Sequence, residues 1–427
     1  MMAANMSAFE LPPLPDYTMQ PLPPLVPWIS DANVALALPI ISYWVVSGFF
    51  HIIDVYDLFP QYRLHTPAEV LKRNHVTRWE CFRDVILQQI IQTVFGLLMG
   101  MLDEAPMTGK DDFNVAWYAQ KIRIAQRALP VVLATIGFNP AQLASKAVSS
   151  YPMLAGALAG GRYSGLVQSA IVEGQMVSIP AFASWELLVA KVLYWYGVPA
   201  LQFIAGFLLL DTWEYFLHRA MHMNKWLYVT FHSRHHRLYV PYAYGALYNH
   251  PFEGFLLDTL GTGLAYLMVG MTPRQSIWFF TCSTVKTVDD HCGYKLPFDP
   301  LQHITSNNAA YHDIHHQSWG IKSNFSQPCF TFWDRYLGTM WQGDVAAKYE
   351  RARRTAQHKL DQEIDNKASA ASGVETTTTK PVSTPLQSRK KASSISSSPS
   401  GLKGLRNKVN ESLHGRGANV LGVESRH

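Results

Sequence analysis

Residues 192–222 read VLYWYGVPALQFIAGFLLLDTWEYFLHRAMH, an apolar run that leads directly into two histidines. The first part of this run, 192–210, contains no Asp, Glu, Lys or Arg. A helix rises about 1.5 Å per residue, so this part is long enough to cross a hydrocarbon core of roughly 30 Å. His218 and His222 are four positions apart and therefore share one helical face. The stretch predicts a membrane-spanning helix that carries a pair of imidazoles beyond its apolar part.

Two other runs, 34–53 and 85–102, also lack these four residue types. A fourth apolar region, 254–288, is interrupted by Pro273 and predicts two short arms that form either a tight helical hairpin or a re-entrant loop. Charged residues make up only 16% of the 427 residues, against roughly 25% in an average soluble protein. The sequence therefore predicts an all-α fold, a membrane bundle of several spanning helices.

Eleven of the 17 histidines lie between His218 and His316. Eight of them form three clusters, here called boxes one, two and three: HRAMH at 218–222, HSRHH at 232–236 and HDIHH at 312–316. Positions i, i+3 and i+4 share a helical face, so each box can direct two or three imidazoles at one point. Eight imidazoles exceed the four ligands of a structural zinc site and are enough for two metal ions with open positions.

The boxes do not identify the metal, because imidazole binds iron, copper, zinc and nickel alike. The zinc protease motif H-E-x-x-H is absent, since Arg219 occupies its second position. Boxes one and two are ten residues apart, so we expect them on the same side of the membrane. Region 254–288 must then return the chain to that side for box three to join them. A two-metal site with open positions at a membrane face suits oxygen activation on inert C–H bonds.

The three boxes resemble those of the fatty acid hydroxylase/sterol desaturase superfamily of membrane di-iron enzymes. The sequence around them is more similar to one branch of it, the fungal sphingolipid C4-hydroxylases (sphinganine C4-monooxygenases). That similarity is carried by HRAMHMNKWLYVTFHSRHHRLYVPYAYGALYNHPFEGFLLDTLG from residue 218, DDHCGYKLPFDP from residue 289, and HHQSWGIKSNFSQPCFTFWD from residue 315. It covers roughly residues 190–340 and does not reach the C-terminal tail.

The resemblance implies a set of metal ligands and no catalytic residue beyond them. The implied ligands of two iron ions are His218, His222, His232, His235, His236, His291, His312, His315 and His316. Metal-bound histidines commonly donate their other ring nitrogen to a carboxylate or a carbonyl. The candidates for that supporting shell are Glu214, His250, Asp289, Asp290 and Asp313. The remaining histidines, among them His51, His65, His75 and His303, are expected to lie outside the site.

The resemblance also implies an activity: insertion of oxygen from O2 at carbon 4 of sphinganine or a dihydroceramide. Electrons would come from cytochrome b5, reduced by NAD(P)H, as a separate partner. One alternative is a desaturase such as a sterol C5-desaturase, which uses the same boxes. A non-enzymatic alternative is a membrane metal transporter, although its histidines would line a path rather than gather at one membrane face.

Charge placement orients the predicted bundle. The first basic residue is Arg63, and the connection 54–84 carries five Lys or Arg, so the positive-inside rule places that connection in the cytosol. Three crossings before His218 then put the N-terminus in the lumen of the endoplasmic reticulum and all boxes at the cytosolic face. The net charge of +5 arises in the tail, because residues 345–427 alone carry +8. A nucleic-acid partner is therefore not expected.

We predict four segments along the chain. Residues 1–33 form a Pro-rich flank, and 34–190 hold the first spans and a long connection. Residues 191–344 form the catalytic domain of the fatty acid hydroxylase type. Residues 345–427, rich in Ser, Thr, Lys and Arg, are predicted to be a disordered cytosolic tail.

Overall fold

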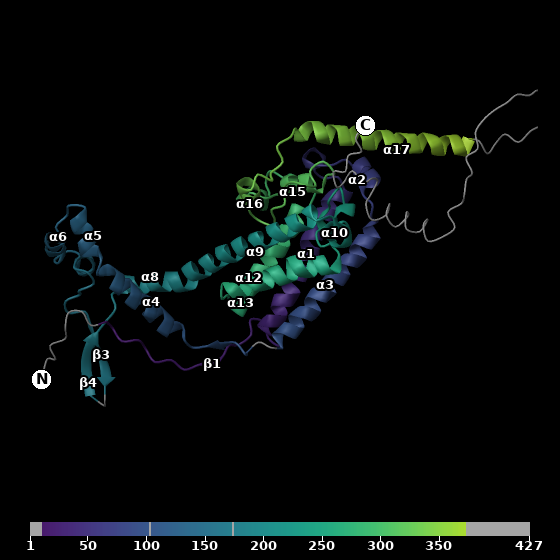
Figure 1. Ribbon diagram of the computed structural model, residues 1–427. Coiled ribbons are helices and arrows are strands. Elements are labelled where there is room, and N and C mark those ends of the chain that lie inside the picture. Colours follow the sequence, from purple (N-terminus) through teal and green to yellow (C-terminus); the bar gives the residue numbers. More distant parts are fainter. Residues whose placement is uncertain (1–10, 102–103, 173–174, 373–427) are drawn as a thin grey trace, which may run out of the picture. The chain divides into compact units, whose positions relative to one another are not determined.

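Figure 1 shows the computed structural model of the protein, which describes residues 11–101, 104–172 and 175–372. The described chain is mainly helical, as the sequence predicts, and divides into two compact units. The first unit contains the described residues of 1–30 and 102–205, and the second unit those of 31–101 and 206–427. The predicted segments differ from this division, because the first two spans belong with the histidine boxes rather than with the long connection that follows them.

The second unit contains most of the helices. They are α1 (Asp31–Val55), α2 (Pro67–Arg73), α3 (Arg78–Gly100), most of α9 (Val198–Met223), α10 (Lys225–Leu227), α11 (Pro251–Gly254), α12 (Gly261–Met268), α13 (Pro273–Asp290), α14 (Leu301–Ile304), α15 (Ala309–His316), α16 (Phe332–Tyr336) and α17 (Val345–Ser372). Between them lie 3-10 turns at Pro60–Tyr62, His235–Arg237 and Ala243–Gly245, and π-helical turns at Tyr228–His232 and Phe255–Leu260.

Three helical segments are long and apolar enough to cross a membrane: Asp31–Val55, Arg78–Gly100 and Ser184–Met223. They contain or overlap the three predicted spans, which are confirmed as helices. On α1 the exposed side chains include apolar ones at helical spacing, namely Ile41, Val45, Phe49 and Ile52. An exposed apolar stripe is what a helix that faces lipid requires, whereas on a water-soluble protein it would be unfavourable.

The opposite side of α1 packs against α13 and belongs to the core of the second unit. Tyr43, fully buried on α1, donates its hydroxyl hydrogen bond to the carbonyl of Tyr244 at 2.8 Å. The same core includes Cys81 and Val85 of α3 and Leu238, which follows box two. The first two spans therefore support the segment that holds the boxes.

The fourth apolar region is broken where the sequence predicts. Helix α12 ends at Met268, Gly270 has a positive φ of 65°, and Pro273 is the first residue of α13. Thr272 caps α13, because its side chain accepts a hydrogen bond from the backbone N–H of Gln275, and the side chain of Gln275 accepts one from the backbone N–H of Thr272. Proline lacks the N–H that a continuous helix would need here, so the break follows directly from the local sequence.

The first unit consists of shorter elements. Its strands are β1 (Gln20–Pro21), β2 (Met107–Thr108), β3 (Val167–Val172) and β4 (Gln175–Pro180), and its helices are α4 (Asp111–Gln126), α5 (Leu129–Thr135), α6 (Pro140–Ala147), α7 (Pro152–Leu158) and α8 (Ser184–Val192), which a π-helical turn follows (Leu193–Gly197). Strands β3 and β4 form an antiparallel hairpin. Helices α4 and α8 pack together around a buried ion pair between Arg123 and Glu186.

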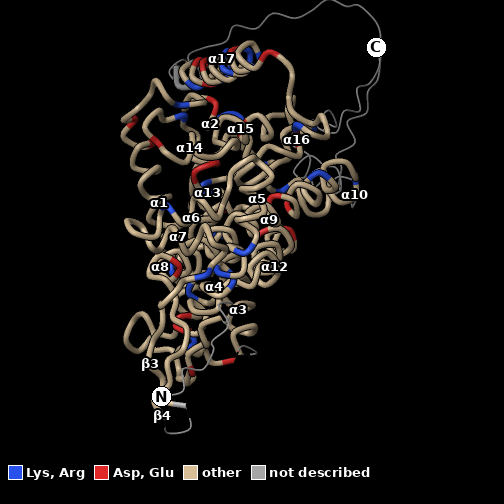
Figure 2. Tube along the Cα trace, turned by 90° about the vertical axis from the view of Figure 1, so that its left-hand side faces the viewer, with Lys and Arg blue, Asp and Glu red and all other residues tan. Residues whose placement is uncertain are grey.

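The C-terminal tail prediction is wrong for its first part, because Val345–Ser372 forms the helix α17. Lys, Arg, Asp and Glu are dense along this helix (Figure 2), and pairs such as Glu350 with Arg354 lie one turn apart. Ala356 is only 1% exposed, so one face of the helix is covered. The predicted disorder of residues 373–427 lies outside the described residues.

Candidate metal centre

The three boxes lie on separate elements that meet in the second unit. Box one is at the end of α9, box two occupies the turns after α10, and box three forms most of α15. His291 directly follows the last residue of α13. Each of the nine predicted ligands is buried, and none is more than 6% exposed.

The nine histidines form two groups. Within each group, one ligand atom per residue lies within 4.8 Å of the others. The first group is His218, His222, His232, His236 and His315, and the second group is His235, His291, His312 and His316. In boxes two and three, the pair at i and i+4 joins one group and the remaining histidine joins the other. Each of these two boxes therefore contributes to both groups.

Hydrogen bonds of the outer ring nitrogens fix how the imidazoles are oriented. Nδ1 of His218 donates to the carbonyl of Phe325 at 2.8 Å, and Nδ1 of His315 donates to the carbonyl of Ser323 at 2.8 Å. In the second group, Nδ1 of His291 donates to the carbonyl of Thr287 at 2.8 Å. A carbonyl oxygen only accepts, so in each of these rings the proton is on Nδ1 and Nε2 presents a lone pair.

The Nε2 atoms then face one another. In the first group, Nε2 of His218 lies 3.1 Å from that of His232, and Nε2 of His236 lies 3.0 Å from that of His232. In the second group, Nε2 of His312 lies 3.1 Å from Nε2 of both His291 and His316. Where both rings carry their proton on Nδ1, as in His218 and His232, two lone pairs face each other and repel unless a cation lies between them. The residues of both groups therefore fit a metal ion.

Burial keeps the imidazoles neutral, which is the form that binds metal. It lowers the pKa of His232 to about 3 and that of His235 to about 4. It also lowers the pKa of His291 to about 3, where the nearby His235 acts in the same direction. At neutral pH these rings therefore carry no charge of their own.

One carboxylate supports a box histidine, and it is one that the sequence analysis missed. Glu253, 1% exposed on α11, accepts a hydrogen bond from Nδ1 of His232. This carboxylate orients the ring in the manner common to metal-bound histidines. The available signal was an acidic residue in the otherwise apolar run from Pro251 to Leu257.

The predicted supporting shell requires correction, because its hydrogen bonds go elsewhere. Asp289 accepts from the amide of Gln302, and Asp290 pairs with Lys286. Asp313 binds His65, which precedes α2, and Tyr349 of α17, whereas His250 caps α11 by accepting from the backbone of Phe252. Glu214 lines a cavity beside the predicted ligands. Side-chain spacing in the sequence does not reveal such partners, since the supporting groups are mostly backbone carbonyls.

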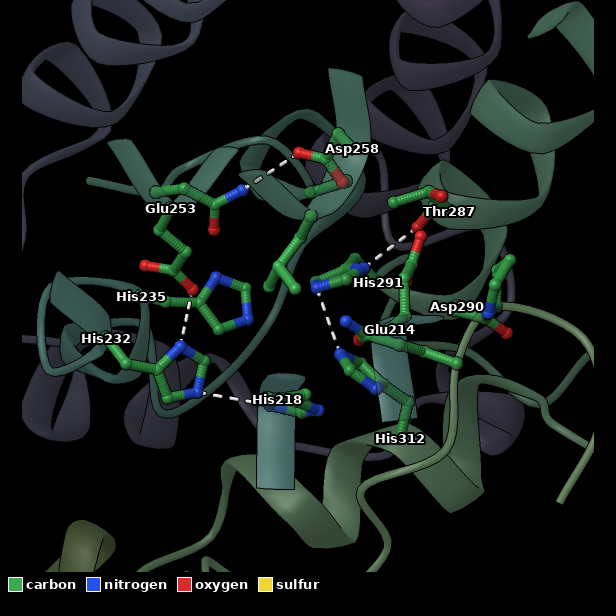
Figure 3. Close-up of a pocket in the computed structure, with 15 residues that line it drawn as sticks. Glu214, His218, His232, His235, Glu253, Asp258, Thr287, Asp290, His291 and His312 are labelled. Atoms are coloured by element: carbon green, nitrogen blue, oxygen red, sulfur yellow. Dashed lines mark hydrogen bonds and ion pairs between the residues drawn. The ribbon is translucent and has the colours of Figure 1, made fainter. Parts of the chain in front are cut away.

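A small cavity of about 30 Å³ adjoins both groups (Figure 3). His218 and His232 of the first group line it, together with His235, His291 and His312 of the second. Its other polar walls are Asn249, Thr287 and Gln327 and the carboxylates of Glu214, Glu253, Asp258 and Asp290. Ala246, Leu257 and Pro328 add apolar contacts. Polar side chains therefore surround the space beside the point at which the histidines converge.

The chain has clear relatives among known proteins. The family described as Fatty acid hydroxylase matches residues 203–339, which contain all three boxes and His291. The chain is 45% identical over 329 residues to "Sphingolipid C4-hydroxylase SUR2" of Saccharomyces cerevisiae, and the match covers 77% of each chain. It is 38% identical over 337 residues to "Sphingolipid C4-hydroxylase sur2" of Schizosaccharomyces pombe, covering 78% of this chain and 97% of the relative.

A plant protein extends the comparison. "Sphinganine C4-monooxygenase 2" of Arabidopsis thaliana is 38% identical over 311 residues, which cover 73% of this chain and 88% of the relative. No solved structure matches the chain. With identities well above 30% over most of both chains, the protein belongs to the fatty acid hydroxylase family.

Proposed function

We propose that this protein is a membrane-bound sphingolipid C4-hydroxylase whose two iron ions are held by the nine histidines of the two groups. It inserts oxygen from O2 at carbon 4 of sphinganine or a dihydroceramide. The observation that carries the proposal is the convergence of neutral imidazole nitrogens on two neighbouring points beside a cavity. The named activities of the relatives support the choice of substrate.

The lining of the cavity suits this substrate class. Carbon 4 of a sphingoid base is close to the amino-bearing carbon 2 and the hydroxyl-bearing carbon 3. A site that oxidises it must therefore accept polar groups next to the metals, whereas a site for mid-chain oxidation would be apolar there. Glu214 and Asp258 offer acceptors for N–H and O–H donors, and Asn249 and Gln327 offer both donors and acceptors.

In this reaction the chain's own residues bind the iron ions and position the lipid. When bound, the iron ions supply the activation of O2 for attack on an unreactive C–H bond. The histidines hold the ions, and the backbone carbonyls and Glu253 keep their rings turned inward. The cavity wall holds the polar end of the lipid so that one carbon faces the ions.

Lipid analysis of cells that lack 4-hydroxylated sphingoid bases tests the function directly. Expression of this protein should produce a 4-hydroxylated base, detected by mass spectrometry after hydrolysis of the lipids. An unsaturated product instead would identify a desaturase. Metal accumulation in the cells with neither product would favour a transporter.

We further propose that the protein lies in the endoplasmic reticulum membrane with its boxes facing the cytosol, where a cytochrome b5-type donor can deliver electrons. A tag that carries an efficiently used glycosylation sequon should therefore be modified at the N-terminus and remain unmodified at the C-terminus, as read from endoglycosidase sensitivity. The native sequon at Asn324 is uninformative in either orientation. Its side chain is 1% exposed and donates to the carbonyl of Tyr311 at 3.0 Å. A glycan on the C-terminal tag would contradict the proposed orientation.

A further inference from the structure

A second buried cluster of polar side chains lies against box three but outside both groups. The imidazole of His65 bridges two carboxylates: its Nδ1 lies 3.0 Å from Oε1 of Glu69, and its Nε2 lies 2.9 Å from Oδ1 of Asp313. All three residues are buried, at 1% to 3% exposed. Asp313 stands between the predicted ligands His312 and His315 in sequence, yet its carboxylate binds away from both groups of histidines.

The bridge carries charge at neutral pH. Burial by itself lowers the pKa of His65, but the charges and hydrogen bonds of Asp313 and Glu69 outweigh it and raise the pKa to about 9. Burial raises the pKa of Glu69, and the hydrogen bond from His65 reverses this and lowers it to about 2. The cation of His65 is therefore held between two carboxylates, and Arg73 pairs with the same oxygen of Glu69 at 3.0 Å. Removing one member of such a buried network leaves charge that the remaining members compensate less well.

Two further elements converge on the same carboxylate of Asp313. Tyr349 of α17 donates its hydroxyl hydrogen bond to Oδ2 of Asp313. The amide of Gln317 donates to the same oxygen at 3.2 Å and to the carbonyl of Tyr239, just after box two, at 2.9 Å. Asp313 thus ties α15 to α17 directly and to α2 through His65, and Gln317 ties it to the segment that follows box two.

Small rotations of α15 would displace the metal ligands that it carries. Side-chain atoms lie roughly 5–6 Å from a helix axis, so a rotation of about 10° displaces them by about 1 Å. Metal–ligand distances tolerate only about 0.2 Å. Helix α15 carries three predicted ligands, His312, His315 and His316, divided between both groups. A device that fixes its rotation would therefore affect both metal ions at once.

We infer that His65, Glu69, Asp313 and Tyr349 form a positioning cluster that fixes α15 and with it the three ligands of box three. Helix α17 is then part of the support of the metal centre rather than an appendage. The inference rests on the proposed metal centre but not on the identity of the substrate. None of the four residues belongs to either group of predicted metal ligands.

The test uses the full chain, purified in detergent and loaded with iron. We expect H65Q and D313N to lower bound iron per chain by half or more. We expect Y349F, which removes one hydroxyl, to keep most of the iron but to change its Mössbauer spectrum. H65K, which restores a cation between the carboxylates, should recover part of the iron that H65Q loses. The thermal midpoint of each variant, followed by circular dichroism, separates loss of metal from loss of fold.

A matched control comes from a contact between α17 and α2 that lies outside the cluster. Lys72 and Glu363 form an ion pair there, and the side chain of Glu363 is 53% exposed and does not touch Asp313. E363Q should therefore keep the iron content and spectrum of the parent.

The outcomes separate this inference from the proposed function. Parent-like iron content and spectra in H65Q, D313N and Y349F would overturn the inference and leave the proposed function intact. A parent protein that binds no iron under the loading conditions would instead refute the proposed metal centre.

Discussion

Alanine at His222, His235 or His315 is expected to lower product formation by at least about 100-fold, because losing even a supporting group of a metal ligand costs about 10- to 100-fold. His222 and His315 belong to the first group and His235 to the second. Loss of either metal ion should therefore stop the reaction. The measurement is product per mole of purified protein, together with iron content.

His303 provides the matched control for this experiment. It is exposed, belongs to neither group, and its ring binds only the carbonyl of Pro297 at 3.0 Å. H303A should therefore retain product and iron close to the parent level. Product near the parent level in all three ligand variants would refute the assignment of the two groups as the metal centre.

Asp334→Ala is expected to destabilise the protein by about 3 kcal/mol or more and to lower its iron content. Asp334 is fully buried and accepts from the backbone of Phe325 at 3.1 Å and of Ser326 at 2.7 Å. It also accepts from the hydroxyls of Tyr311 at 2.8 Å and Thr339 at 2.5 Å. Each buried donor left without a partner costs about 1–3 kcal/mol, which sets the size of the effect.

Replacement of Asp334 should also weaken metal binding, because Asp334 holds the loop that orients two ligands. In that loop the carbonyl of Ser323 accepts from His315 and the carbonyl of Phe325 accepts from His218. Denaturant unfolding and iron content measure the two effects. Asp344→Ala is the control, since Asp344 is exposed and only caps the start of α17 through the backbone of Ala347. Equal stability and iron content in the two variants would contradict this role of Asp334.

The sequence by itself determined the features that depend on near neighbours in the chain. Uncharged runs of sufficient length predicted the spans that became α1, α3 and α9, because helix length and apolarity are local properties. Pro273 predicted the break before α13 in the same way. The spacing within the boxes predicted that each box would direct two or three imidazoles at one point, and in each box the pair at i and i+4 does share a group. His291 was added by the resemblance alone, and it lies in the second group.

Only the tertiary structure decided which histidines share a group and what supports them. His218 is oriented by the carbonyl of Phe325, 107 residues away, and His65 bridges to Asp313 across 248 residues. Backbone carbonyls leave no mark in a sequence, and a histidine outside the boxes carries no sign that two distant carboxylates will enclose it. The charge-rich stretch that forms α17 was predicted to be disordered for the same reason, because the contact between Tyr349 and Asp313 exists only once the chain has folded. Such long-range partners are fixed by packing, which local spacing cannot specify.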